Sequence, residues 1–203
     1  MKITEMSIPN AFRIVPEIHE DERGSFMELA RSSLLSEAIG YPFVIGQANC
    51  SLSSRNTIRG IHGTALPPGQ AKLVTCVSGS VLDVAVDLRV GSPTFGQYEM
   101  TRQDAGTGIS VYLSDGIGHA FVALTDDACV NYLCSEKYVH GTMIEINPLD
   151  PDIGIPWELD GPPVMSDKDG AAPGLAAAAD AGILPGYEEC LEHYASLRPA
   201  AAA

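Results

Sequence analysis

The chain has 203 residues, of which 45% are hydrophobic and 19% are charged, proportions typical of a single folded domain with a sizeable core. Twelve basic residues against 26 acidic ones give a net charge of −14, which disfavours nucleic acid and anionic membranes as partners. No apolar run approaches the roughly 20 residues that a membrane span needs, and the first residues lack the pattern of a secretory signal. We therefore expect a cytoplasmic protein, in which an anionic substrate would need a locally basic pocket.

Short alternating or β-branched segments, separated by turns rich in Gly, Pro and Asn, predict a β-sandwich or barrel. No helical pattern between them is long enough for a crossover, so the strands should pair antiparallel. The segments are IGQANCSL (45–52), NTIRGIHGT (56–64), AKLVTCVSG (71–79), SVLDVAVDLR (80–89), GQYEMT (96–101), ISVYLS (109–114), HAFVAL (119–124) and ACVNYLCS (128–135). They place a β core at about 10–150.

The composition changes after this core. Residues 150–173 are rich in Pro, Gly and Asp and predict a long ordered loop. The stretches GLAAAADAGILP and GYEECLEHYASL predict short helices within 174–198, the first of them stopped by Gly182 and Pro185. We expect one domain over 1–203.

The cysteines and histidines give no pattern of a disulfide framework or a metal site. The five cysteines include no CxxC pair and fall mostly in apolar runs, as expected of reduced core thiols. Metal-binding barrels of this kind usually carry two histidines two apart and then a carboxylate. Here Thr64 stands two after His62, the next acidic residue is Asp83, and the other histidines are isolated. We expect no metal.

Strand alternation groups polar side chains on particular faces. Gln47 and Asn49 share one face, while the opposite face, which includes Leu52, is expected to be dry. Lys72 and Tyr132 each fall on an otherwise apolar face of their strand. Either one alone is often a structural residue, but several together favour a polar site.

Arg59 and His62 are three residues apart, so a regular strand would direct them to opposite faces. Gly60 between them is suited to a β-bulge that re-aims one of the two. A regular ladder through Gly60 would keep the two side chains out of a shared pocket.

Several longer motifs lie between roughly 14 and 185: DERGSFME, QANCSLS, RGIH, PPGQAKLVTCVSGSVLDVAVDLRVGSPTFG, GIGHAFVAL, NPLDPDIGIPW and SDKD. Together they resemble the dTDP-4-dehydrorhamnose 3,5-epimerases and related sugar-nucleotide epimerases. The resemblance implies an all-β fold, a double-stranded β-helix (jelly-roll cupin), with short C-terminal helices. It also implies a homodimer that needs no metal or organic cofactor and inverts carbons beside the C4 ketone of a dTDP-4-keto-6-deoxyhexose.

Inverting such a carbon requires removing a proton, stabilising the enolate oxygen and returning a proton to the opposite face. An imidazole suits the base, since its unperturbed pKa is about 6.5. The resemblance gives His62 this role, with Asp169 holding the ring. It places Lys72 at the C4 oxygen and makes Tyr132 the acid that returns the proton.

Other matched positions concern substrate binding. Arg23 and Arg59 resemble residues that grip the diphosphate, a task suited to guanidinium groups. Tyr138 matches an aromatic residue that stacks on thymine. The remaining matches are nucleotide contacts (Phe26, Glu28, Gln47 and Asn49) and further substrate contacts (His119 and Lys168).

Two departures from the family pattern point to substrate specificity. Gly63 stands where relatives carry Phe or Tyr after the catalytic histidine, and we expect the loss of that ring to widen the pocket or change how the hexose sits. Met143 and Ile144 stand where relatives carry a Glu-His pair, and Glu145 is the residue that would compensate.

The sequence leaves three functions open. A double 3,5-epimerase is the first; the alternative is a single-site 3- or 5-epimerase for an unusual deoxysugar of a secondary metabolite. The third, a non-catalytic sugar-nucleotide-binding barrel, is disfavoured because all four acid-base residues are present.

Overall fold

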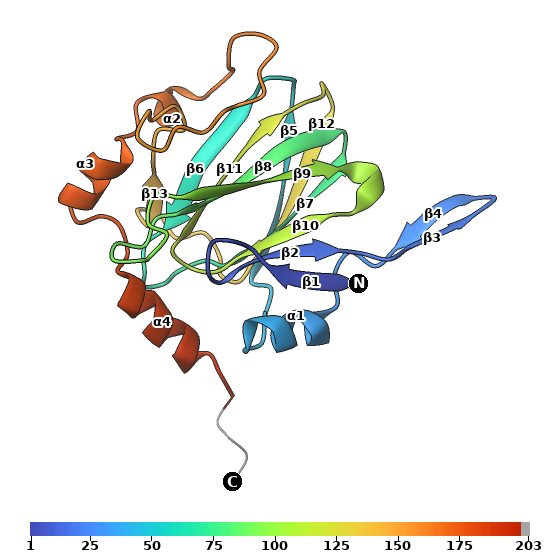
Figure 1. The fold of residues 1–203 in the computed structure, drawn as a ribbon, viewed down its shortest axis with the longest axis horizontal. Coiled ribbons are helices and arrows are strands. Elements are labelled where there is room, and N and C mark those ends of the chain that lie inside the picture. The colour runs from blue at the N-terminus through green and yellow to red at the C-terminus, as the bar shows by residue number, and fades with distance from the viewer. Residues whose placement is uncertain (200–203) are drawn as a thin grey trace.

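The computed structural model describes residues 1–199, which form two β-sheets facing each other (Figure 1). The first sheet has the strand order β1 (Lys2–Glu5), β2 (Ala11–Val15), β10 (Ser110–Leu113), β7 (Lys72–Ser78), β12 (Ala128–Cys134) and β5 (Gln47–Ser53). The second has the order β13 (Met143–Glu145), β6 (Ile58–Thr64), β11 (Ile117–Ala123), β8 (Ser80–Asp87) and β9 (Tyr98–Asp104). All pairings within these sheets are antiparallel, in agreement with the expected jelly-roll cupin.

Each of the eight predicted segments contains a strand. The prediction missed β1, β2, β13 and a hairpin of β3 (Ile18–Asp21) and β4 (Gly24–Met27). These strands are only three to five residues long, too short to show a clear alternation.

The main core lies between the two sheets. Val74 and Val130 of the first sheet meet Val81 and Phe121 of the second, all four fully buried. Burying each such side chain contributes about 1.5–3 kcal/mol. This core holds the sheets at a fixed separation, so that side chains from both can reach one pocket.

The helices lie outside the sheets. The predicted C-terminal helices are α3 (Leu175–Asp180) and α4 (Tyr187–Ser196), and Gly182 between them has a left-handed φ of +67°. The predicted loop contains one short helix, α2 (Asp167–Gly170). No helix within residues 1–199 is long and apolar enough to cross a membrane.

Helix α1 (Ser32–Ile39) was not predicted. It has no side chain capping its first turn and no acidic residue there, so the usual signals of a helix start are missing. Burial of Leu35 and Ile39 against the outer side of the first sheet stabilises it instead.

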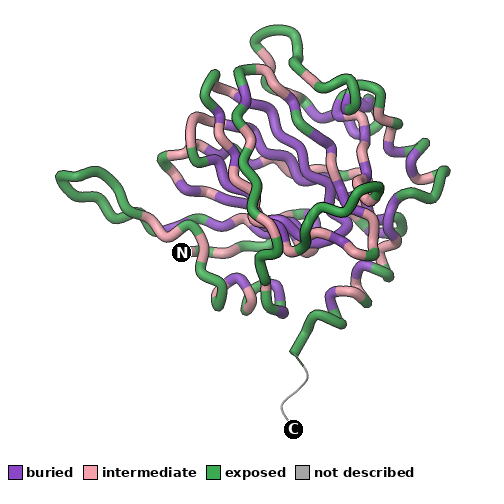
Figure 2. The backbone as a smooth tube through the Cα atoms, turned by 180° about the vertical axis from the view of Figure 1, so that it is seen from behind, coloured by how far each residue is buried: buried purple, intermediate pink, exposed green. Residues whose placement is uncertain are grey.

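The β3–β4 hairpin projects from the body as a separate two-stranded sheet (Figures 1 and 2). Every residue of β3 is exposed, and Phe26 on β4 has 72% of its surface exposed. An isolated hairpin is marginally stable in water, so this one needs another surface to pack on.

The expectation of a dry outer face on β5 was wrong. Leu52 is 74% exposed and Cys50 is exposed, because β5 is the edge strand and nothing in the described chain covers its outer side. The expectation of core thiols holds for Cys76, Cys134 and Cys190. Cys50 is instead at the surface, with its Sγ 3.2 Å from that of the half-buried Cys129, and all five thiols are free.

Candidate active site

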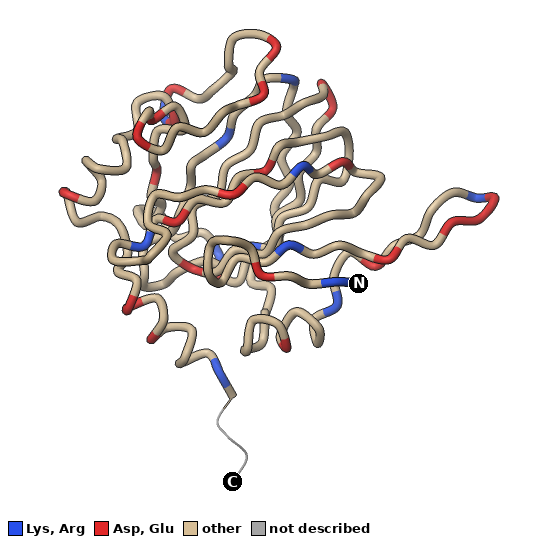
Figure 3. The backbone as a smooth tube through the Cα atoms, viewed as in Figure 1, with Lys and Arg blue, Asp and Glu red and all other residues tan. Residues whose placement is uncertain are grey.

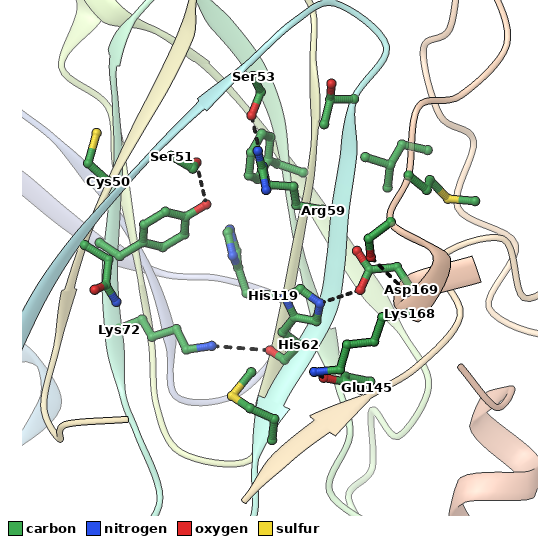
Figure 4. A pocket seen from close by; sticks show the side chains of 18 of the residues that line it. Cys50, Ser51, Ser53, Arg59, His62, Lys72, His119, Glu145, Lys168 and Asp169 are labelled. Atoms are coloured by element: carbon green, nitrogen blue, oxygen red, sulfur yellow. Dashed lines mark hydrogen bonds and ion pairs between the residues drawn. The ribbon is translucent and has the colours of Figure 1, made fainter. Parts of the chain in front are cut away.

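A pocket of about 740 Å³ opens between the two sheets (Figure 4). Strands from both sheets line it, and the segment 164–169 crosses one side, tied to the start of β6 by a bridge between Val164 and Thr57. Most of the predicted site residues meet here. They are Gln47, Asn49, Arg59, His62, Lys72, His119, Tyr132, Tyr138, Met143, Glu145, Lys168 and Asp169.

The pocket is locally basic, although acidic residues are spread over the rest of the chain (Figure 3). Arg59, Lys72 and Lys168 line it, against two carboxylates: Glu145, which pairs with Lys168, and Asp169, which is hydrogen-bonded to His62. An anionic ligand would therefore meet excess positive charge.

The predicted bulge at Gly60 is present. His119 on β11 faces His62 and Phe121 faces Arg59, so two steps along β11 correspond to three along β6. Gly60 has a φ of +114°, and a Cβ there would lie 2.5 Å from the carbonyl oxygen of His119. Glycine thus permits the extra residue, which brings Arg59 and His62 into the same pocket.

His62 Nε2 lies 2.7 Å from Asp169 Oδ1. Helix α2 positions this carboxylate: Ser166 caps the helix by accepting a 3.0 Å hydrogen bond from the backbone N–H of Asp169. Burial alone would raise the pKa of Asp169, but hydrogen bonds from His62 and Ser166 bring it below its usual value. A neutral imidazole donating Nε2–H to this carboxylate keeps the Nδ1 lone pair free for a substrate proton.

Lys72 reaches the pocket from β7 and is almost fully buried. Its Nζ donates a 3.4 Å hydrogen bond to the backbone oxygen of His62, and burial lowers its pKa. The ammonium is therefore fixed beside the histidine, on the pocket side of the opposite sheet.

Tyr132 projects from β12, so it and His62 belong to different sheets. Burial raises the pKa of the phenol, which lies 3.2 Å from Ser51 Oγ. A proton donor and a base can in this way approach a bound molecule from two sides.

A second histidine–carboxylate pair lies beneath the pocket. His119 Nε2 is 2.6 Å from Asp83 Oδ2, both side chains are buried, and the imidazole meets the Tyr132 ring edge-on at 5.8 Å. Asp83 was not among the site residues predicted from the sequence. The available signal was its position on the inward face of β8, between Val81 and Ala85, where a carboxylate requires a partner.

Polar contacts order one end of the pocket. Gln47 donates to Asn49 Oδ1 at 2.9 Å and accepts a 2.8 Å bond from the backbone N–H of Tyr138. Arg59 is held by Ser53, whose Oγ accepts from Nε at 3.0 Å. The shared face predicted for Gln47 and Asn49 is confirmed.

Three predicted binding residues lie outside the pocket of their own chain. Arg23 is at the tip of the β3–β4 hairpin, paired with Asp21, and Phe26 lies on the same hairpin. Glu28, just after it, pairs with Arg31. None of these three lines the pocket.

The residues expected to set specificity separate into two groups. Met143 and Glu145 line the pocket, and Glu145 lies opposite His62 in the β13–β6 ladder. Gly63 points the other way: a Cβ there would meet Leu88 and Ile144 in the cluster behind the second sheet, at 3.2 and 3.6 Å. An aromatic ring lost at Gly63 therefore does not widen the pocket directly, because strand alternation turns this position away from His62.

Comparison with known proteins identifies the family. The model of the dTDP-4-dehydrorhamnose 3,5-epimerase family matches residues 5–177. A dTDP-4-dehydrorhamnose 3,5-epimerase from Streptomyces griseus is 47% identical over 95% of this chain and 96% of its own. The crystal structure of ChmJ, a 3'-monoepimerase from Streptomyces bikiniensis in complex with dTDP-quinovose, has a TM-score of 0.92 and 46% identity over 95% of this chain and 98% of its own. The rmlC epimerase of Mycobacterium tuberculosis has a TM-score of 0.95 and 41% identity over 98% of this chain and 100% of its own. The chain therefore belongs to the dTDP-4-dehydrorhamnose 3,5-epimerase family and is a carbohydrate epimerase.

Proposed function

We propose that this enzyme inverts C3, C5 or both in a dTDP-4-keto-6-deoxyhexose, by removing a proton beside the C4 ketone and returning one to the opposite face. The proposal rests on the arrangement of the acid and base groups around the pocket. The His62–Asp169 pair lies on the side of the second sheet, Tyr132 lies on the side of the first sheet, and Lys72 lies beside them.

His62 acts as the base. Nδ1 takes the proton from the carbon, and the resulting imidazolium is stabilised by Asp169, whose lowered pKa keeps it ionised at neutral pH. The exposed fraction of the His62 side chain, 32%, leaves the ring accessible to a ligand in the pocket.

Lys72 stabilises the enolate. Its ammonium is buried, so its attraction to a developing oxyanion is much less screened than it would be in water. Removing one such donor typically costs about 10²–10³-fold in kcat.

Tyr132 returns the proton. Because burial raises the pKa of the phenol, it stays protonated at neutral pH and is available as an acid on the face opposite His62. Proton transfer through these groups needs no organic cofactor or metal.

The ordered end of the pocket is proposed to bind the nucleotide. Arg59 would hold the diphosphate, Gln47 and Asn49 the nucleotide end, and Tyr138, which is 54% exposed, would stack on thymine. His119 and Lys168 would contact the sugar side.

We further propose a homodimer in which Arg23, Phe26 and Glu28 act in the pocket of the second copy. Three observations support this. The residues lie on or directly after a projecting hairpin, the part of the chain that the structure describes gives this hairpin no packing surface, and edge strand β5 exposes Leu52 beside the pocket. A second copy of the chain would cover both the hairpin and the exposed side of β5.

Relatives of both kinds, 3-epimerases and 3,5-epimerases, match this chain at 46–47% identity. Which of the two carbons is inverted must therefore be determined by experiment. The enzyme is incubated with dTDP-4-keto-6-deoxyglucose in deuterated water, and the hydrogens at C3 and C5 are followed by NMR. Exchange at both carbons is expected of a double epimerase and exchange at one of a single-site enzyme.

The matched control is His62→Ala, which should abolish exchange while leaving dTDP binding largely intact. Undiminished exchange in this variant would contradict the assignment of the base. Binding without any exchange in the wild-type protein would favour a sugar-nucleotide-binding barrel.

A further inference from the structure

Ser51 is the hydrogen-bonding partner of the proposed acid. Its Oγ lies 3.2 Å from the Tyr132 hydroxyl, and within residues 1–199 no other side chain makes a hydrogen bond to that phenol. The contact follows from the sheet register: Ser51 on β5 faces Val130 on β12, and Asn49 faces Tyr132, so Ser51 is a diagonal neighbour of the tyrosine on the inward face.

The direction of this hydrogen bond matters for the chemistry. If Tyr132 donated to Ser51, the phenolic proton would point away from the bound sugar. With Ser51 donating to the phenolic oxygen, the proton of Tyr132 is free to point into the pocket. A serine hydroxyl rotates freely enough to supply that donor, and Ser51 is only half-buried.

We propose that Ser51 is a positioning residue for Tyr132: its hydroxyl donates to the phenolic oxygen, directs the phenolic proton toward the reacting carbon and stabilises the phenolate that remains. This inference rests on the proposed function, and specifically on Tyr132 being the acid.

The proton transfer is balanced without any further reactant. The enolate carbon forms a C–H bond with the electron pair of the enolate, the O–H bond of Tyr132 breaks, and the negative charge moves from the enolate to the phenolic oxygen. The Ser51 hydroxyl then donates to an anion, and such charge-assisted hydrogen bonds are stronger than neutral ones. The bond therefore strengthens during the reaction, which is what lowers a barrier.

The acidity of the phenol agrees with this geometry. Burial raises the pKa of Tyr132, and the strongest effect in the opposite direction is the hydrogen bond to Ser51. The hydrogen bond from Ser51 thus offsets part of the effect of burial on the pKa of Tyr132, in the direction that eases proton donation.

Ser53 provides a matched control on the same strand. It lies two residues further along, so its side chain shares the inward face, but its Oγ accepts from Arg59 Nε at 3.0 Å instead of contacting Tyr132. Ser51→Ala and Ser53→Ala remove the same atom from two positions with different expected roles.

The experiment separates exchange from inversion. In deuterated water, His62 can remove a proton, exchange it with solvent and return deuterium to the same face, which labels the substrate without inverting it. Inversion additionally requires Tyr132. NMR and mass spectrometry measure the deuterium in the recovered, uninverted substrate and in the inverted product. The proteins compared are the wild type, Ser51→Ala, Ser51→Thr, Ser53→Ala and Tyr132→Phe.

We expect Ser51→Ala to lower inversion by about tenfold or more, because a hydrogen bond to a charged oxygen is lost, while exchange with retention stays at the wild-type rate. Tyr132→Phe should lose inversion to a greater extent than Ser51→Ala, again with exchange with retention preserved. Ser51→Thr, which keeps the hydroxyl, should restore inversion, and Ser53→Ala should raise KM while leaving the ratio of inversion to exchange unchanged.

Unchanged inversion in Ser51→Ala would overturn the inference, as would an equal fall of inversion and exchange, which indicates general disruption of the pocket. Failure of Ser51→Thr to restore inversion would also overturn it. These results are distinct from failure of the proposed function itself, in which the wild-type protein would show neither exchange nor inversion.

Discussion

Lys72 and Tyr132 lie on neighbouring strands of one sheet, and burial changes the acidity of the two side chains in opposite directions. It lowers the pKa of Lys72, since the charged ammonium is disfavoured, and raises that of Tyr132, since the phenolate is disfavoured. As pH rises, Lys72 must therefore lose its catalytically useful proton before Tyr132 does. The alkaline loss of activity should belong to the lysine.

We predict that kcat/KM falls on the alkaline side with an apparent pKa below the ordinary lysine value of about 10.4. Lys72→Arg should remove this fall while lowering activity, because a guanidinium stays charged throughout the accessible range. Lys72→Met should lower kcat by about 10²–10³-fold at pH values where Lys72 of the wild type is charged, and the difference from the wild type should shrink as pH rises through the alkaline limb. The measurement is the pH profile of initial rates for the three proteins; an unchanged alkaline limb in the arginine variant would assign it to another group.

At the scale of the element, several features of strand β6 could be predicted from the sequence. Alternation predicted the strand, and Gly60 between Arg59 and His62 predicted its bulge. The same alternation places Gly63 behind the sheet, which the family comparison alone did not indicate. Asp83 was missed because its partner, His119, comes from a different strand, and such pairs depend on a sheet order that spacing does not encode.

Gly60→Ala should destabilise the fold and reduce activity. The new Cβ would lie 2.5 Å from the His119 carbonyl oxygen and 2.7 Å from Ala120 Cα, and these backbone atoms belong to the paired strand β11. We expect a loss of about 2–4 kcal/mol in the free energy of unfolding, from strain at positive φ together with this overlap. Urea denaturation measures it.

Gly91→Ala is the matched control for Gly60→Ala. Gly91 also has a positive φ, +89°, but a Cβ there would have no neighbour within 4 Å. It should cost only the left-handed strain of about 1–2 kcal/mol and leave kcat unchanged. Equal losses in the two variants would show that the close approach to β11 is not what requires glycine at position 60.

At the scale of the whole molecule, two surfaces have no packing partner among residues 1–199 of the single chain: the β3–β4 hairpin and the outer side of edge strand β5. The sequence motifs predicted Arg23, Phe26 and Glu28 as binding residues, yet none of them reaches the pocket of its own chain. No pattern within one chain reveals which copy a residue serves. The proposed homodimer, in which each copy inserts its hairpin into the pocket of the other, would reconcile the motifs with the geometry.

Co-expression of Arg23→Ala and His62→Ala chains with different affinity tags tests this arrangement. In the purified mixed dimer, the pocket of the Arg23→Ala chain keeps His62 and receives an intact hairpin from the His62→Ala chain. One of the two sites of the dimer is therefore complete. Measured at low substrate concentration, kcat/KM should recover to about half the wild-type value per dimer, since the two sites of a twofold dimer are equivalent. A mixed dimer of His62→Ala and Lys72→Ala chains should stay inactive, because both residues serve the pocket of their own chain. If Arg23 also served its own chain, the first mixed dimer would have one defect in each site and would show no recovery.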